Sequence, residues 1–151
     1  MGVQRNRSDI LIVEYDDVDY ELILEALKVI GLNNRVLRAI DGAEALDLVL
    51  NPGNARIKDF QPGFMILDLN MPRKNGWDVL KEMKLNPRSR QLPIIVLATS
   101  VDQDDVVKCY ELGVNSFIQK PVRFQDLVEI FDTVVKYWLE VVKLPKRDGR
   151  A

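Results

Sequence analysis

The sequence contains no histidine and only one cysteine, and these shortages exclude several classes of protein. Without histidine there can be no Ser-His-Asp or Cys-His catalytic centre, no histidine-containing metal site and no phosphohistidine carrier. The single cysteine, Cys109, can form neither an intrachain disulfide nor a zinc site, and it fits a reducing, cytoplasmic setting. The chemistry left to the chain is that of carboxylates, lysines, hydroxyl groups and metals bound through oxygen.

Long apolar runs and a strong charge imbalance are also missing. No apolar run approaches transmembrane length, and residues 1–9 are too polar for a signal peptide. The net charge of −2 predicts no general attraction to nucleic acid or to an anionic membrane. With 151 residues, the chain has the length of one domain. We expect a single domain over 1–151, with a core at about 9–143 between a polar N-terminal tail and a basic C-terminal tail.

Five short apolar runs alternate with helix-like segments along the chain. The runs are Ile10–Val13, Val36–Ile40, Phe64–Leu67, Ile94–Ala98 and Ser116–Ile118. The helix-like segments are 17–30, 42–50, 76–86, 102–112 and 123–143. Four runs are nearly continuous, as in strands buried on both faces of a parallel sheet, and the weaker fifth run indicates an edge strand. The alternation predicts an open, doubly wound α/β sheet.

Short sequence signals mark where several of these helices begin and end. Asp41 with Glu44 reads as a capping box, and Asn75 is a candidate N-cap. Gly31 and Gly113 follow two of the helical segments and are typical of helix stops. These signals support the strand-helix alternation independently of the apolar pattern.

Charged residues stand at the predicted carboxyl ends of the strands, where open α/β sheets collect their ligands. Asp68 ends the third run, Glu14 follows the first, and Lys120 follows the fifth. Two neighbouring carboxylates repel each other, and an oxygen-bound cation such as Mg²⁺ relieves that repulsion. Carboxylates, a metal and a lysine around one aspartate could accept a phosphoryl group. The simpler alternative is an ion-paired rim without chemistry.

Several stretches resemble the receiver domains of two-component response regulators. They are Ile-Leu-Ile-Val-Glu at 10–14, Leu-Asp-Leu-Asn-Met-Pro-Arg-Lys-Asn-Gly at 67–76, Leu-Pro-Ile-Ile-Val-Leu at 92–97 and Lys-Pro at 120–121. The end of the chain, 137–145, is similar to the phytochrome-associated subgroup, whose members stand alone without an output domain. The resemblance implies a flavodoxin-like (βα)5 fold with strand order 2-1-3-4-5 and an extended C-terminal helix.

The resemblance also implies a role for individual residues. Asp68 would be the phosphoacceptor, and Lys120 would contact the phosphoryl group. Glu14, Asp68 and the backbone carbonyl of Asn70 would hold Mg²⁺. Phe117 occupies the aromatic switch position of the family, and it also suits core packing.

Two positions depart from the family pattern. The second acid that normally follows the first strand is replaced by Tyr15, a poor ligand for Mg²⁺, and Asp16 comes next. Either Asp16 substitutes for it or the metal binds weakly. Position 98, where the family has a switch hydroxyl, is Ala98, and Thr99 could replace it only if the strand end shifted.

The last helix carries more apolar surface than packing on one sheet requires. Beside its core stripe, further apolar and aromatic residues favour an interface with a second copy of the chain: Ile130, Tyr137, Trp138, Val141 and Leu144. In the alternative interpretation, the tail or the loop at 51–63 folds over this surface. Phytochrome-associated receivers, which the chain resembles, are often dimers through this region.

The leading hypothesis is a signalling module, and not an enzyme with a separate substrate, that accepts a phosphoryl group on Asp68 from a phytochrome-like sensor histidine kinase. The second is a pseudo-receiver that binds a partner without being switched by phosphate, as Tyr15 and Ala98 favour. The third is a small flavodoxin-like cofactor binder or enzyme, although no glycine-rich loop follows the first strand.

Overall fold

The computed structural model describes residues 6–51, 53, 59–69, 71 and 76–145, and these contain one parallel sheet of five strands. The order is β2-β1-β3-β4-β5, which confirms the order that the resemblance implied. The strands are β1 (Asp9–Val13), β2 (Val36–Ala39), β3 (Pro62–Asp68), β4 (Ile94–Ala98) and β5 (Ser116–Gln119). The weaker fifth run does form an edge strand, as predicted.

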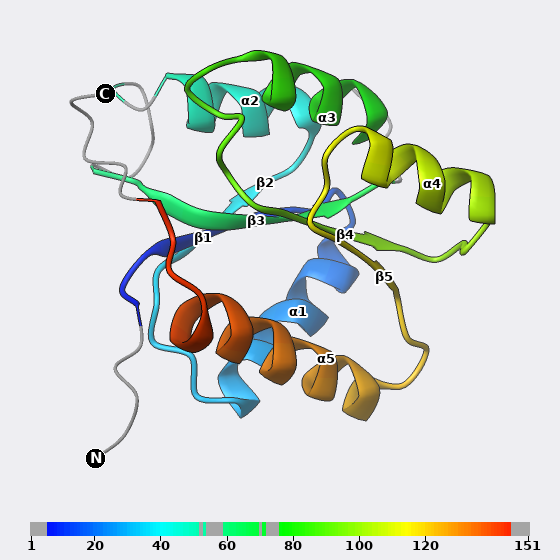
Figure 1. The fold of residues 1–151 in the computed structure, drawn as a ribbon. Coiled ribbons are helices and arrows are strands. Elements are labelled where there is room, and N and C mark those ends of the chain that lie inside the picture. Colours follow the sequence, from blue (N-terminus) through cyan, green and yellow to red (C-terminus); the bar gives the residue numbers. More distant parts are fainter. Residues whose placement is uncertain (1–5, 52, 54–58, 70, 72–75, 146–151) are drawn as a thin grey trace.

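Helices cover both faces of the sheet, as Figure 1 shows. α2, α3 and α4 lie on one face, and α1 and α5 lie together on the other. Their bounds are α1 (Asp17–Val29), α2 (Gly42–Leu50), α3 (Gly76–Leu85), α4 (Gln103–Glu111) and α5 (Phe124–Lys136), followed by the π-helical turn η2 (Tyr137–Val141). In the described part of the chain, no helix is both long and apolar enough to cross a membrane.

The alternation of side chains along the buried strands divides the core between the two faces of the sheet. In β1, Leu11 and Val13 pack toward α2 and α3, and Ile10 and Ile12 pack toward α1 and α5. Cys109 is fully buried in the first of these cores, where it packs as a small hydrophobic residue. Burial on both faces explains why the strand sequences are nearly continuous apolar runs.

The predicted start and stop signals act as helix caps. The Asp41 carboxylate accepts a hydrogen bond from the Glu44 backbone N–H at 2.9 Å at the start of α2. Gly31 and Gly113 follow the C-caps of α1 and α4 with φ of +73° and +90°, a conformation that glycine adopts without strain. Asn75, the fourth predicted signal, lies outside the described residues.

The structure departs from the sequence prediction at β3 and at the end of α5. β3 begins at Pro62, two residues before the predicted run, since proline is tolerated at the first residue of a strand. The last helix is not one continuous α-helix over 123–143, because it changes to the π turn at Tyr137 and becomes extended at Val142. The Asn6 backbone N–H donates to the Leu139 carbonyl within that turn at 2.7 Å.

The change of direction at Val142 corrects the prediction that Leu144 belongs to an interface. Leu144 is only 8% exposed, because the tail folds back over the start of β3. A Cβ atom at residue 63 would lie only 2.8 Å from the Leu144 Cδ1 atom. Because residue 63 is glycine, the Leu144 side chain can pack there. Leu144 is therefore unavailable for an interface, whereas Tyr137 and Val141 of the same apolar surface stay exposed.

Candidate functional site

Glu14 and Asp68 lie side by side where β1 and β3 end. The register pairs Val13 with Leu67, so the next residue of each chain segment is the acid. The Glu14 backbone N–H continues the sheet by donating to the Ala39 carbonyl at 3.0 Å. The side chains of Glu14 and Asp68 are 2% and 6% exposed. The sheet itself therefore holds two carboxylates together, largely shielded from water.

Lys120 joins these acids from the end of β5. Its backbone N–H donates to the Ala98 carbonyl at 2.8 Å, and this hydrogen bond fixes the position of the Lys120 backbone at the edge of the sheet. The ammonium Nζ lies 3.0 Å from Glu14 Oε1 and 3.0 Å from Asp68 Oδ2. The three residues that sequence analysis placed at strand ends are thus in direct contact.

The third carboxylate of the cluster belongs to Asp19, which sequence analysis missed. Asp19 lies in the first turn of α1, and its Oδ2 atom is 3.2 Å from Lys120 Nζ. One carboxylate oxygen from each of Glu14, Asp19 and Asp68 lies within 4.8 Å of the others. An available signal was the spacing from the N-cap Asp16, because the residue three positions after an N-cap faces back toward it.

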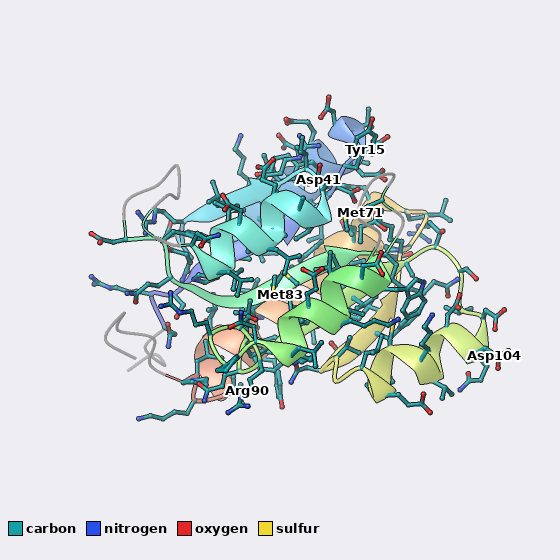
Figure 2. The ribbon with its side chains drawn as sticks, turned by 90° about the horizontal axis from the view of Figure 1, so that it is seen from above. Tyr15, Asp41, Met71, Met83, Arg90 and Asp104 are labelled. Atoms are coloured by element: carbon teal, nitrogen blue, oxygen red, sulfur yellow. The ribbon has the colours of Figure 1, made fainter. Side chains whose placement is uncertain are left out.

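Asp16 and Tyr15 take other positions. The Asp16 carboxylate caps α1 by accepting from the Asp19 N–H at 2.9 Å, and the Asp16 N–H lies 3.3 Å from Glu14 Oε2. Tyr15 is 54% exposed and lies at the periphery in Figure 2, on the same side of the view as Met71. Among the described acids, Asp19 and not Asp16 completes the cluster with Glu14 and Asp68.

The residues implied in switching lie beside the cluster. Ala98 is the last residue of β4 and is 4% exposed, so a buried methyl group occupies the position of the family's hydroxyl. Thr99 lies beyond the strand and is exposed, and its part as a substitute remains a prediction. Phe117 is partly buried against the core beneath α3 and α4, and its N–H donates to the Tyr110 hydroxyl at 3.2 Å.

The connection after Asp68 passes close to the start of α3. A Cβ atom at Gly76 would lie 2.9 Å from the Leu69 Cα atom, so only glycine permits this approach. The Gly76 N–H also lies 3.4 Å from the Leu69 carbonyl. Asn70, whose carbonyl was expected to bind the metal, lies outside the described residues.

Burial and mutual repulsion set the protonation of the cluster. Burial, reinforced by the neighbouring Asp68, raises the pKa of Glu14 to about 7, and Lys120 opposes this shift. Lys120 is itself partly buried, but its bonds to Asp68 and Glu14 raise the pKa of its ammonium group above the ordinary value. Lys120 therefore stays charged, while Glu14 loses its proton near neutral pH.

We expect the stability of the metal-free protein to fall between pH 5 and 7.5 because of Glu14. Its folded pKa of about 7 exceeds the unfolded value of 4.5, so the folded state binds more protons in this range. The slope is at most about 1.4 kcal/mol per pH unit and the whole change is about 2–3 kcal/mol. Urea unfolding in chelator should show this loss relative to Glu14→Gln, and parallel pH profiles would contradict it.

The donor set fits a hard divalent cation. Three carboxylate oxygens converge from the residue after β1, from α1 and from the end of β3. Oxygen ligands of this kind are what Mg²⁺ and Mn²⁺ prefer. Their combined negative charge exceeds the single positive charge of Lys120, so a divalent cation would lower the repulsion among them. The arrangement can thus bind a metal next to a nearly buried aspartate.

A parallel 2-1-3-4-5 sheet with an acidic cluster and a lysine at its carboxyl edge defines a class of signalling domain. The sequence matches the response regulator receiver domain family over residues 10–132. The chain belongs to this family, whose members act in two-component signalling, and the resemblance noted from its motifs is confirmed.

Individual relatives associate the chain with phytochrome response regulators. It is 36% identical to the response regulator Rcp1 of Synechocystis sp. over 136 residues, covering 90% of this chain and 92% of Rcp1. The phosphorylated cyanobacterial phytochrome response regulator RcpA superposes with a TM-score of 0.83 at 34% identity, covering 93% and 99% of the two chains. The Mn²⁺-bound form of Rcp1 gives 0.81 at 35% identity, with coverage of 92% and 99%.

Proposed function

We propose that this receiver domain accepts a phosphoryl group on Asp68 from a phytochrome-like sensor histidine kinase. The observation that carries the proposal is the contact of Lys120 Nζ with the nearly buried Asp68 Oδ2 at 3.0 Å, because it sets a cation beside the nucleophilic oxygen. The similarity to RcpA, a phosphorylated phytochrome response regulator, favours the same donor class.

In the proposed reaction, an Asp68 carboxylate oxygen attacks the phosphorus atom of a phosphohistidine. A P–O bond forms as the P–N bond breaks, and the imidazole nitrogen keeps the bonding electron pair. Lys120 balances the negative charge of the phosphoryl oxygens. The domain is then no enzyme with a separate substrate, although it assists its own phosphorylation and the later attack of water that releases phosphate.

Glu14, Asp19 and Asp68 are the residues we propose to hold Mg²⁺. Asp19 would take the role of the family's second acid, which is replaced by Tyr15 in this sequence. A bound divalent cation would withdraw charge from the phosphoryl oxygens. That the similar protein Rcp1 has a Mn²⁺-bound form supports the binding of a divalent cation here. We propose the cytoplasm as the site of action, since the single cysteine fits a reducing compartment.

The second candidate function is that of a pseudo-receiver, and Ala98 is the observation that favours it. A buried methyl group at position 98 cannot bond a phosphoryl oxygen, and in the family this bond moves the switch. Such a domain would dock on a partner protein in one fixed conformation. The two candidates differ in whether Asp68 becomes phosphorylated.

The deciding experiment is the intact mass of the protein after incubation with acetyl phosphate and Mg²⁺. We expect the mass to increase by one phosphoryl group in the wild type and not in Asp68→Asn, because the amide is a poor nucleophile. Asp47→Asn, which changes an acid on α2, is the matched control and should still gain the group. A negative result would be repeated with a phosphorylated kinase, and no adduct from either donor would favour the pseudo-receiver.

We propose that the chain forms a homodimer through the exposed part of the α5–η2 surface. Tyr137 and Val141 are 50% and 71% exposed. Ile130 and Trp138 are half-buried at the margin of the core, and the Trp138 ring lies 6.2 Å from that of Phe64. Exposed aromatic and aliphatic residues next to a rigid core are typical anchors of interfaces.

Tyr137→Ser combined with Val141→Ser should convert the dimer to a monomer, because it removes the most exposed apolar side chains of this surface. Both residues lie outside the core, so circular dichroism should show an unchanged fold. Light scattering measures the mass, and Val107→Ser with Tyr110→Ser on α4 serves as the control for exposed apolar residues elsewhere. An unchanged dimer mass in the α5–η2 variant would disprove this interface.

A further inference from the structure

Arg38 of β2 lies against the connection between β1 and α1, which carries Glu14 and leads into the first turn of α1, where Asp19 lies. Its Nε donates to the Glu14 carbonyl and its Nη2 to the Tyr15 carbonyl, both at 2.9 Å. Its Nη1 lies 2.8 Å from Asp17 Oδ1. The arginine side chain is only 19% exposed, whereas the Asp17 side chain is 89% exposed. The bond to the Glu14 carbonyl, which is partly buried, is therefore better protected from competing water than the Asp17 pair.

The same guanidinium group also contacts the residue that follows Asp19. Its central carbon lies 4.6 Å from the centre of the Tyr20 ring, within the range of a cation–π contact. Arg38 therefore binds the backbone carbonyls of residues 14 and 15, which precede Asp19. It also contacts the side chains of Asp17 and Tyr20, one before and one after Asp19. Only a planar group with several donors can make all of these contacts at once.

We infer that Arg38 is a positioning residue for the metal site. It fixes the β1–α1 connection in a conformation in which the Tyr15 side chain points to solvent. In this conformation the Asp19 carboxylate supplies the metal ligand that residue 15 does not provide. This inference rests on the proposed function, because it presupposes that Glu14, Asp19 and Asp68 bind a divalent cation. Arg38 itself does not touch the cation.

A positioning role and a purely electrostatic role predict opposite results when Arg38 is removed. A nearby positive charge repels a divalent cation, so its loss would tighten metal binding if charge were its only effect. If Arg38 holds Asp19 in place, its loss weakens binding even though a repulsive charge has gone. Outer residues that orient metal ligands contribute about 10–100-fold to metal affinity.

The test is a titration with Mn²⁺, in which electron paramagnetic resonance counts the free ion directly. We expect Arg38→Met and Asp19→Asn each to weaken binding by about tenfold. The double variant should be no weaker than Asp19→Asn alone, because Arg38 acts through Asp19. Arg38→Lys keeps the charge but lacks the fork of donors, so it should also bind more weakly than the wild type. It provides the same test if Arg38→Met fails to fold.

Arg35→Met is the matched control, since Arg35 pairs with Asp9 at the other end of the sheet and should not affect Mn²⁺ affinity. Wild-type or tighter affinity in a folded Arg38 variant, together with weaker binding by Asp19→Asn, would overturn the positioning role alone. Unchanged affinity in both Asp19→Asn and Asp68→Asn would instead overturn the proposed metal site. Equal losses in the Arg35 and Arg38 variants would assign the effect to general destabilisation and also overturn the inference.

Discussion

Lys120→Met is expected to lower the free energy of unfolding by about 3 kcal/mol at pH 7 in the absence of metal. Lys120 Nζ is bonded to Glu14, Asp19 and Asp68, and two of these carboxylates are nearly buried. Removing the cation leaves like charges facing each other without compensation, and removing one partner of a buried pair typically costs about 3–5 kcal/mol. Proton uptake by Glu14 relieves part of this repulsion.

Urea unfolding with and without Mg²⁺ checks this prediction. Mg²⁺ should stabilise the Lys120→Met variant, because it supplies positive charge to the same carboxylates. Asp68→Asn in the same chain should recover much of the lost stability, since it removes one of the repelling charges. Lys136→Met is the control, because its pair with Asp132 is exposed and should contribute less than about 1 kcal/mol. Equal effects of the two lysine variants would refute the argument.

Arg35→Met is expected to lower the free energy of unfolding without changing phosphoryl acceptance. The Asp9 carboxylate, 8% exposed, accepts hydrogen bonds from Arg35 Nε at 2.9 Å and Nη2 at 2.7 Å. It also accepts from the Gln61 N–H at 2.8 Å. Loss of the arginine leaves Asp9 with less compensation, although the exposure of Arg35 reduces the cost below that of a fully buried pair.

This variant is measured by urea unfolding alongside the acetyl phosphate reaction. Asp9→Asn in the same chain should recover part of the stability, because the charge that needed the arginine is gone. Lys28→Met removes an exposed pair with Glu25 and should change stability by less than about 0.5 kcal/mol. If Arg35→Met abolished the phosphoryl adduct while remaining folded, the two ends of the sheet would be coupled, against the prediction.

The sequence alone was sufficient for the sheet and for the first three residues of the site. Buried parallel strands are nearly continuous apolar runs, so their positions are visible without tertiary contacts. Because the carboxyl ends of parallel strands share one edge, Glu14, Asp68 and Lys120 could be brought together from their places in the sequence. The contacts of Lys120 Nζ with both acids confirm that reasoning.

The places of Asp19 and Leu144 could not be predicted in the same way. Each depends on the direction in which a segment of the chain runs or faces, and the apolar pattern does not encode that direction. Which face of its first turn a helix presents to a site depends on its N-cap, and here Asp16 and the contacts of Arg38 set that orientation. Leu144 continues a helical stripe in sequence, but the chain leaves the helix at Val142 and buries it against Gly63.

Sequence by itself therefore determined the family of this protein and, through that family, the strand order. It also placed Asp68 among the charged residues at the strand ends, because strand periodicity and strand-end motifs are local properties. Tertiary structure decided which carboxylate completes the cluster, how far Glu14 is buried and which part of the last helix stays exposed. These properties arise from distances between segments far apart in the chain, and only packing fixes such distances. The raised pKa of Glu14 has the same origin, since burial by distant segments is its main cause.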